Sequence, residues 1–386
     1  MVEAYITRTM LTWARERLNE SRQLLAHRMH VNPAKLEAWE DGTALPSIRQ
    51  ARELARKLRI PLGYLYLSTP PIENIPLPDL RTMAHAPVQK PSPDFLDVIY
   101  DAFRKQQWYR EYLISESVPK IEFIGKFNLT ENPLRIATDI QATLGIDDEL
   151  RRSSYSWEQF LTALIRRAEK ARILVLRNGV VGNNTYRKLD VQEFRGFAIC
   201  DDIAPLVFIN GSDYKTAQIF TLAHELAHFW IGQGGISNPN YMLRADQQSN
   251  QIDQLCDNVA AEVLVPRNAF VVNWDDLREL DYNLDRLATN FRVSSFVILR
   301  RAYTLDKIST NVFHAKYNEL LTKVRPKPDD SGGDFHNLLK SRNSLTLTST
   351  LIAGVVEGTI LPSEAARLLN MRVGSLRNIE SQILVG

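Results

Sequence analysis

Apolar residues recur every three to four positions along most of the chain, and this spacing predicts a multidomain, mainly α-helical protein. In residues 1–66 the pattern predicts short helices joined by tight turns, with Asn32 and Ser47 placed to cap the helices that follow them. Longer helices are expected at about 94–113, 132–144, 156–170, 213–231, 251–264, 283–303 and 309–323.

A different pattern lies between the helices expected at 156–170 and 213–231. Ala171–Leu176, Gly196–Ile199 and Leu206–Ile209 are short apolar runs with β-branched residues, separated by Asn-Gly and Asp-Asp pairs. Such runs are typical of strands. We therefore expect a small sheet here, inside an α+β domain.

Two stretches of turn-forming composition divide the chain. Seven prolines lie between residues 67 and 93, and this density resists helix formation and indicates a linker. Residues 325–333 (RPKPDDSGG) indicate a second linker. The expected domains are a five-helix N-terminal module at 1–66, a central domain at 94–324 with its core at about 150–270, and a helical C-terminal module at 334–386.

Composition narrows the class of protein. The 386 residues include 47 basic and 45 acidic side chains, for a net charge of +2, and two cysteines. Two thiols are too few for a disulfide framework or a four-cysteine zinc site. No apolar run reaches the roughly 18 residues of a membrane helix. Charged residues such as Arg8 and Arg15 stand where a secretion signal needs an apolar core, so we expect a cytoplasmic protein that makes no membrane contact.

The segment His224-Glu225-Leu226-Ala227-His228 carries the most specific chemistry in the chain. Histidines four residues apart on a helix share a face, so both can bind one zinc ion. Glu225 is placed to accept a proton from the water that the zinc activates. This H-E-x-x-H pattern is typical of zinc peptidases. It predicts His224 and His228 as ligands of Zn²⁺ and Glu225 as the catalytic residue.

A catalytic zinc needs a third protein ligand, and acidic candidates lie on the helix expected at 251–264. Asp253 and Asp257 are four residues apart and share a face, whereas Glu262 points away from Asp253. One aspartate is expected to bind zinc while the other accepts a hydrogen bond from a ligand histidine. Spacing leaves Asp253, Asp257 and Glu262 open as the third ligand. Cys256 beside them is expected to be a buried structural cysteine, and the alternative is that it binds the metal.

The metal motif, followed by Cys256-Asp-Asn-Val-Ala-Ala-Glu-Val-Leu-Val-Pro266, resembles the ImmA/IrrE family of metallopeptidases. The resemblance implies a zincin-like fold and identifies Asp253 as the third zinc ligand, at a position where the family usually has Glu. Asp257 stands where the family usually has Asn, and the resemblance implies that it hydrogen-bonds to a ligand histidine.

The same resemblance implies a site-specific regulatory endopeptidase that cleaves a partner transcriptional repressor in a stress or mobile-element response. In related zinc peptidases an edge strand before the motif helix pairs with the substrate, and Leu206–Ile209 is expected to be that strand. The alternative is a transcription regulator or toxin–antitoxin component whose peptidase-like domain senses or scaffolds without proteolysis. The intact Glu225 disfavours this alternative, because a structural zinc site needs no base.

A second motif lies near the N-terminus. Arg22–Arg28, the turn Met29–Val31 and Pro33–Glu40 predict a helix-turn-helix, and Trp39-Glu40-Asp41-Gly42 followed by Pro46 resembles the phage-repressor (Cro/CI, or XRE) type. The second helix of such a unit enters the major groove of DNA. The residues expected to contact DNA are Arg22, Arg28, Asn32, Ala34, Lys35 and Arg49.

The charge of this module leaves its partner open. Residues 1–66 carry 11 basic and 7 acidic side chains, a net charge of +4, which is mild for a DNA-binding module. Glu37 also opposes a phosphate-lined groove. The alternative is that the helix-turn-helix docks onto protein, for instance onto a similar module of the substrate repressor.

Overall fold

The computed structural model of the protein describes residues 2–73, 75, 77, 91–237, 251–323 and 335–376. The chain forms two compact units, Met1–Pro76 with Lys90–Asp97 and Leu77–Gln89 with Val98–Gly386. Most of the linker expected at 67–93, and all of the linker expected at 325–333, lie outside the described residues.

The first unit is a bundle of short helices around its own hydrophobic core. Leu25, Leu36 and Trp39 are buried at the centre of this core. The five-helix layout predicted for residues 1–66 is confirmed, with a 3-10 helix as the last element. The elements are α1 (Arg8–Arg17), α2 (Arg22–Met29), α3 (Pro33–Asp41), α4 (Ile48–Lys57) and η1 (Leu62–Tyr66).

Local capping signals define the ends of α3 and α4. The side chain of Asn32 accepts a hydrogen bond from the Ala34 N–H, and that of Ser47 accepts one from the Gln50 N–H, as predicted. Gly42 ends α3 with a φ of 76°, in the left-handed region that residues with a Cβ rarely adopt.

A buried ion-pair network holds α1, α2 and α3 together. The Glu40 side chain is fully buried, and each of its oxygens lies 2.6 Å from a guanidinium Nε, one of Arg15 and one of Arg22. Burial alone would raise the pKa of Glu40, but the hydrogen bonds from Arg15 and Arg22 outweigh it and hold the pKa below its usual value. Glu40 is therefore ionised at neutral pH and joins three helices.

The second unit is built around a four-stranded sheet with the order β1-β5-β4-β6 in the described part of the chain. β1 and β5 are parallel, whereas β4 runs antiparallel to both β5 and β6. β2 and β3 form a separate antiparallel pair. The strands are β1 (Leu174–Asn178), β2 (Val180–Val181), β3 (Asn184–Lys188), β4 (Gly196–Ile199), β5 (Leu206–Asn210) and β6 (Gly235–Ser237).

The position of β5 contradicts one prediction. Leu206–Ile209 was expected to be an edge strand that pairs with substrate, but β5 lies inside the sheet and hydrogen-bonds to β1 on one side and β4 on the other. All five of its residues are buried. Its backbone groups are therefore already paired, and β5 cannot add a peptide strand.

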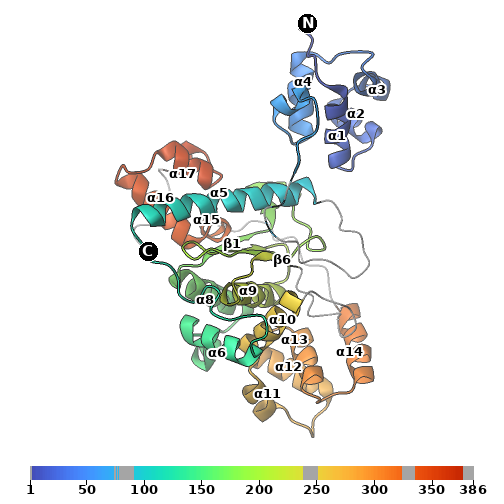
Figure 1. The fold of residues 1–386 in the computed structure, drawn as a ribbon. Helices are drawn as coiled ribbons and strands as arrows, with labels where there is room; N and C mark the ends of the chain where they lie inside the picture. The colour runs from blue at the N-terminus through green and yellow to red at the C-terminus, as the bar shows by residue number, and fades with distance from the viewer. Residues whose placement is uncertain are drawn as a thin grey trace. The chain divides into compact units, whose positions relative to one another are not determined.

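Helices surround this sheet. Figure 1 shows α8 and α9 on one side of the sheet and α5 on the other. Helix α9 packs against β4 and β5 and also against α10, which in turn packs against α6. The helices are α5 (Pro93–Ser115), α6 (Pro133–Leu144), α7 (Asp148–Ser153), α8 (Trp157–Lys170), α9 (Lys215–Trp230), α10 (Gln251–Leu264), α11 (Arg267–Asn273), α12 (Leu280–Phe291), α13 (Ser295–Thr304), α14 (Thr310–Lys323), α15 (Phe335–Asn343), α16 (Leu345–Val356) and α17 (Pro362–Leu368).

The prediction of a single helix at 283–303 is wrong, because the chain forms two helices there, α12 and α13. Arg292 ends α12 with a φ of 58°, and the side chain of Ser294 caps α13 by accepting from the Val297 N–H. Apolar spacing continues across this break because both helices pack into the same core. Periodicity alone therefore does not reveal the turn.

The C-terminal segment packs against the central sheet through α15. Helix α15 lies along β1, and Arg177 of β1 donates a hydrogen bond of 3.0 Å to the Ser341 hydroxyl. The buried carboxylate of Glu169 accepts a hydrogen bond of 2.8 Å from the Leu345 N–H. Residues 335–376 are thus bonded to elements of the unit that contains the sheet. Among the described helices, none combines the length and apolar character needed to cross a membrane.

The Glu40 network gives a first prediction. Replacing Glu40 with Ala leaves the guanidinium groups of Arg15 and Arg22 facing each other without a buried anion, and we expect the first unit to lose about 3 kcal/mol. Hydrogen exchange of the amides of α1–α3 in the full chain measures this loss.

The matched control is Glu37→Ala, because the Glu37 side chain is 55% exposed and also pairs with Arg22. It should cost less than about 1 kcal/mol. Because the pKa of Glu40 is lower in the folded state, its contribution is present at neutral pH and declines as the pH falls through that folded value. If Glu40→Ala and Glu37→Ala destabilised the first unit equally at neutral pH, the stabilising role of the buried Glu40 ion pairs would be contradicted.

Candidate metal centre

Helix α9 carries the H-E-x-x-H motif through the interior of the second unit. His224, Glu225 and His228 have no exposed surface. The helix is buried on several sides because the sheet covers one face and α10 covers another. Polar side chains in such a position must find polar partners or bind an ion.

The two imidazoles face the same point. His224 Nε2 and His228 Nε2 lie 3.3 Å apart. Two nitrogen ligands held at about 2.0–2.1 Å from one tetrahedral metal ion are themselves about 3.3–3.4 Å apart. The pair therefore fits a shared metal ion without rearrangement.

The outer nitrogens of both rings have acceptors as partners. His228 Nδ1 donates to the Gln233 carbonyl oxygen at 2.7 Å, and a carbonyl can only accept. His224 Nδ1 lies 2.8 Å from Asp257 Oδ1. With the hydrogens on Nδ1, the neutral rings turn their Nε2 lone pairs toward each other.

Two lone pairs at this distance need a positive charge between them. Burial alone would lower the pKa of His224, but the carboxylates of Asp253 and Asp257 outweigh it and raise the pKa to about 10. Burial, together with the charge on His224, lowers the pKa of His228 to about 3. The neighbouring carboxylates thus favour a positive charge on this pair of rings.

Asp253 is the acidic residue that lies at this point. Its Oδ1 is 3.7 Å from His224 Nε2 and 3.9 Å from His228 Nε2. Those distances exceed the ligand spacing of a tetrahedral site by only a few tenths of an ångström. Glu262 lies elsewhere, since it pairs with Arg301 and accepts from the Arg267 N–H. The geometry therefore favours Asp253 over the other two candidates.

Glu225 points toward the sheet rather than toward α10. A Cβ placed on Gly196 of β4 would lie 2.7 Å from Glu225 Oε1, closer than two such atoms can approach. Only glycine at this position leaves room for the carboxylate. Gly196 is a positioning residue that sequence reasoning did not single out, because a strand glycine gives no indication of which side chain lies against it.

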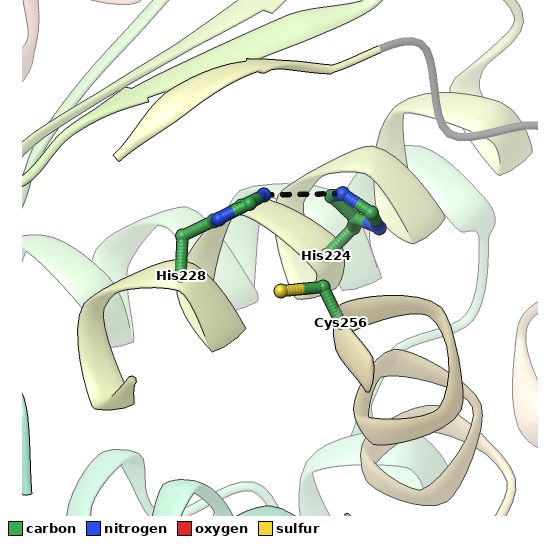
Figure 2. Close-up of side chains that lie close together, drawn as sticks. All are labelled: His224, His228 and Cys256. Atoms are coloured by element: carbon green, nitrogen blue, oxygen red, sulfur yellow. Dashed lines mark hydrogen bonds between the residues drawn. The ribbon is translucent and has the colours of Figure 1, made fainter. Parts of the chain in front are cut away.

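Cys256 is the other residue that sequence reasoning did not assign to the centre. Its Sγ and the ring nitrogens of His224 and His228 all lie within 4.8 Å of one another. Figure 2 shows the thiol directed from the neighbouring helix into the space between the imidazoles. Burial, then the charges of Asp253, Glu225 and Asp257, raise the pKa of this thiol well above its usual value.

The residues expected to contact DNA are only partly available in the first unit. Arg22 is bonded to Glu40, and Arg28 pairs with Glu20 and donates to the Lys57 carbonyl oxygen at 2.8 Å. The remaining expected contacts, Asn32, Ala34, Lys35 and Arg49, are exposed. Two of the three expected arginines are thus engaged in ion pairs within the unit.

Comparison with known families bears on the second unit. Residues 168–303 match the IrrE N-terminal-like domain, the peptidase M78 family. The matched segment contains all of α9 and α10, so it carries the whole candidate metal centre, and it is a metallopeptidase-like domain. The match does not extend to the first unit. We found no significant match to the chain among curated proteins.

The hydrogen bond to His224 in this peptidase-like domain gives a second prediction. Asp257→Ala removes the acceptor that orients the ring, and we expect metal affinity to fall about 10–100-fold. Asp257→Asn keeps an acceptor oxygen, so its metal affinity should lie between that of Asp257→Ala and that of the wild type. Competition with a chromophoric chelator measures the affinities.

The control is Asn258→Ala, on the next residue of α10, where the side chain is exposed. Its metal affinity should equal that of the wild type. If Asp257→Ala bound metal as tightly as Asn258→Ala, the proposed role of Asp257 would be excluded.

Proposed function

We propose that the protein is a zinc-dependent endopeptidase in which His224, His228 and Asp253 hold the metal and Glu225 is the general base. The observation that carries the proposal is the convergence of two buried Nε2 atoms and a carboxylate oxygen within 3.9 Å. Two nitrogens and one carboxylate oxygen form a donor set that zinc peptidases use.

The residues of this centre have distinct roles in peptide hydrolysis. Zinc, when bound, supplies a Lewis acid that polarises the scissile carbonyl and lowers the pKa of water. Glu225 takes the proton from the attacking water and delivers it to the leaving amine. Gly196 keeps the Glu225 carboxylate on the sheet side of the motif helix. Asp257 and the Gln233 carbonyl hold the two imidazoles in the ligand tautomer.

The substrate that we propose is a partner transcriptional repressor, cleaved in a stress or mobile-element response. The family match of residues 168–303 supports a metallopeptidase-like domain. The helical unit before it supports a regulatory role, because a general protease does not need a helix-turn-helix. A sensor or scaffold without proteolysis is the rival, and the fully buried Glu225 disfavours it. A carboxylate that is costly to bury serves no purpose in a purely structural site.

We propose that the first unit docks onto protein. The exposed charges of α3 are Lys35, Glu37 and Asp41, a net charge of −1, and Arg22 of α2 pairs with both acidic side chains. This face therefore offers little attraction for DNA phosphates. Arg22, which was expected to contact DNA, is bonded to Glu40. An acidic helix face fits a basic partner surface, such as the DNA-contacting face of a repressor.

The role of Glu225 gives a third prediction. Glu225→Gln keeps the shape of the side chain and removes the base, so cleavage of the co-expressed repressor should fall by about 10²–10⁴-fold. Zinc content should stay at the wild-type level, because Glu225 is not a ligand. Undiminished cleavage by this variant would exclude the catalytic assignment.

The docking role of α3 gives a fourth prediction. Reversing two charges with Glu37→Lys and Asp41→Lys should lower kcat/KM for the repressor about tenfold and leave kcat unchanged. The control is Glu53→Lys on α4. A salt-sensitive mobility shift of promoter DNA by the wild-type chain would contradict docking and support the alternative that the unit binds DNA.

A further inference from the structure

Cys256 takes up a position at the metal centre that the proposed mechanism does not use. Its side chain is fully buried on α10. Figure 2 shows its sulfur pointing toward the two imidazoles. Cys256 thus belongs to the hydrophobic core and also borders the face of α9 that carries two ligand nitrogens.

The spacing along α10 explains why the thiol reaches this point. Asp253, Cys256 and Asp257 are related by three and four residues, so all three lie on one face of the helix. That face packs against α9. Asp257 reaches the outer nitrogen of His224, and Asp253 reaches the inner nitrogens of both histidines. Cys256 lies between these two aspartates in sequence and on the same face.

The distances fit coordination. In a tetrahedral site with about 2.0–2.1 Å to nitrogen and 2.3 Å to sulfur, a nitrogen and a sulfur ligand are about 3.6 Å apart. The Cys256 sulfur and the two imidazole nitrogens all lie within 4.8 Å of one another. The sulfur is therefore near enough to the two nitrogens to bind the same ion after a small change in χ1.

We propose that Cys256 is a thiolate ligand of the metal, so that the centre has two imidazoles, one carboxylate and one thiolate. The proposal rests on the metal centre of the proposed function and not on its catalysis. On binding, the thiol loses its proton to solvent and the sulfur forms a bond to the ion. A thiolate is a soft donor, so the centre selects zinc and other thiophilic ions over magnesium and manganese.

This ligand set also determines how water reaches the ion. Four protein donors complete a tetrahedral sphere, so water enters only if the ion becomes five-coordinate or one donor leaves. Glu225 is outside this set, because its carboxylate lies against Gly196 of β4.

Cobalt(II) in place of zinc tests the proposal on the full chain. A cobalt–thiolate bond gives a charge-transfer band in the near ultraviolet, whereas tetrahedral nitrogen and oxygen ligands give only visible d–d bands. We expect the wild type to show both kinds of band. Cys256→Ala should lose the near-ultraviolet band and keep the visible bands, and circular dichroism of each variant shows that it is folded.

The chain supplies a matched control, because its other cysteine lies nearby but faces elsewhere. The Cys200 thiol donates to the His228 carbonyl oxygen at 3.4 Å. Cys200→Ala should therefore keep the charge-transfer band. A wild-type spectrum with visible bands and no charge-transfer band overturns the proposal without any variant, as does loss of that band only in Cys200→Ala. If no cobalt bands appeared at all, the chain would have no metal centre, and the proposed function would fail as well. Failure of the Cys256 proposal alone is thus distinguished from failure of the proposed function.

Discussion

The second unit depends on one electrostatic constraint, which is that two buried imidazoles turn the same nitrogen toward one point. His224 Nε2 and His228 Nε2 are 3.3 Å apart, and the outer nitrogens of both rings are bonded to acceptors. Fully buried lone pairs at this distance are unfavourable unless a cation lies between them. The carboxylate of Asp253 adds negative charge at the same point. The interior of the fold is therefore built to receive a positive ion.

The surrounding fold meets this constraint with rigid elements. The motif lies on α9, which packs against β4 and β5 on one side and α10 on the other. The first turn of α10 delivers Asp253, and the next turn delivers Asp257. The glycine at position 196 gives the Glu225 carboxylate its place on the sheet side. Regular helices and strands hold ligand and base side chains more accurately than loops do, which suits a centre that must orient a peptide bond.

Most of the longer helices and the ligand face were predictable from sequence, but the break between α12 and α13 and the contacts between elements were not. The i, i+4 spacing of His224 and His228, and that of Asp253 and Asp257, indicates shared faces because helix geometry fixes it. The Gln233 carbonyl that orients His228 lies in a turn, and no sequence pattern marks it. The inner position of β5 also escaped prediction, because its parallel pairing with β1 joins segments about 30 residues apart in sequence and local patterns do not show it. Helix spacing places Cys256 on the same face as the two aspartates, but only the packing of α10 against α9 shows that this face meets the histidines.

The central claim is that His224 and His228 hold one metal ion together. X-ray absorption spectroscopy at the zinc edge, on the zinc-loaded full chain, tests it most directly. The account predicts one zinc ion per chain, with the outer-shell scattering of two imidazole rings bound at about 2.0–2.1 Å. A zinc ion with one imidazole or none in its shell, or a chain that binds no zinc at all, would contradict it.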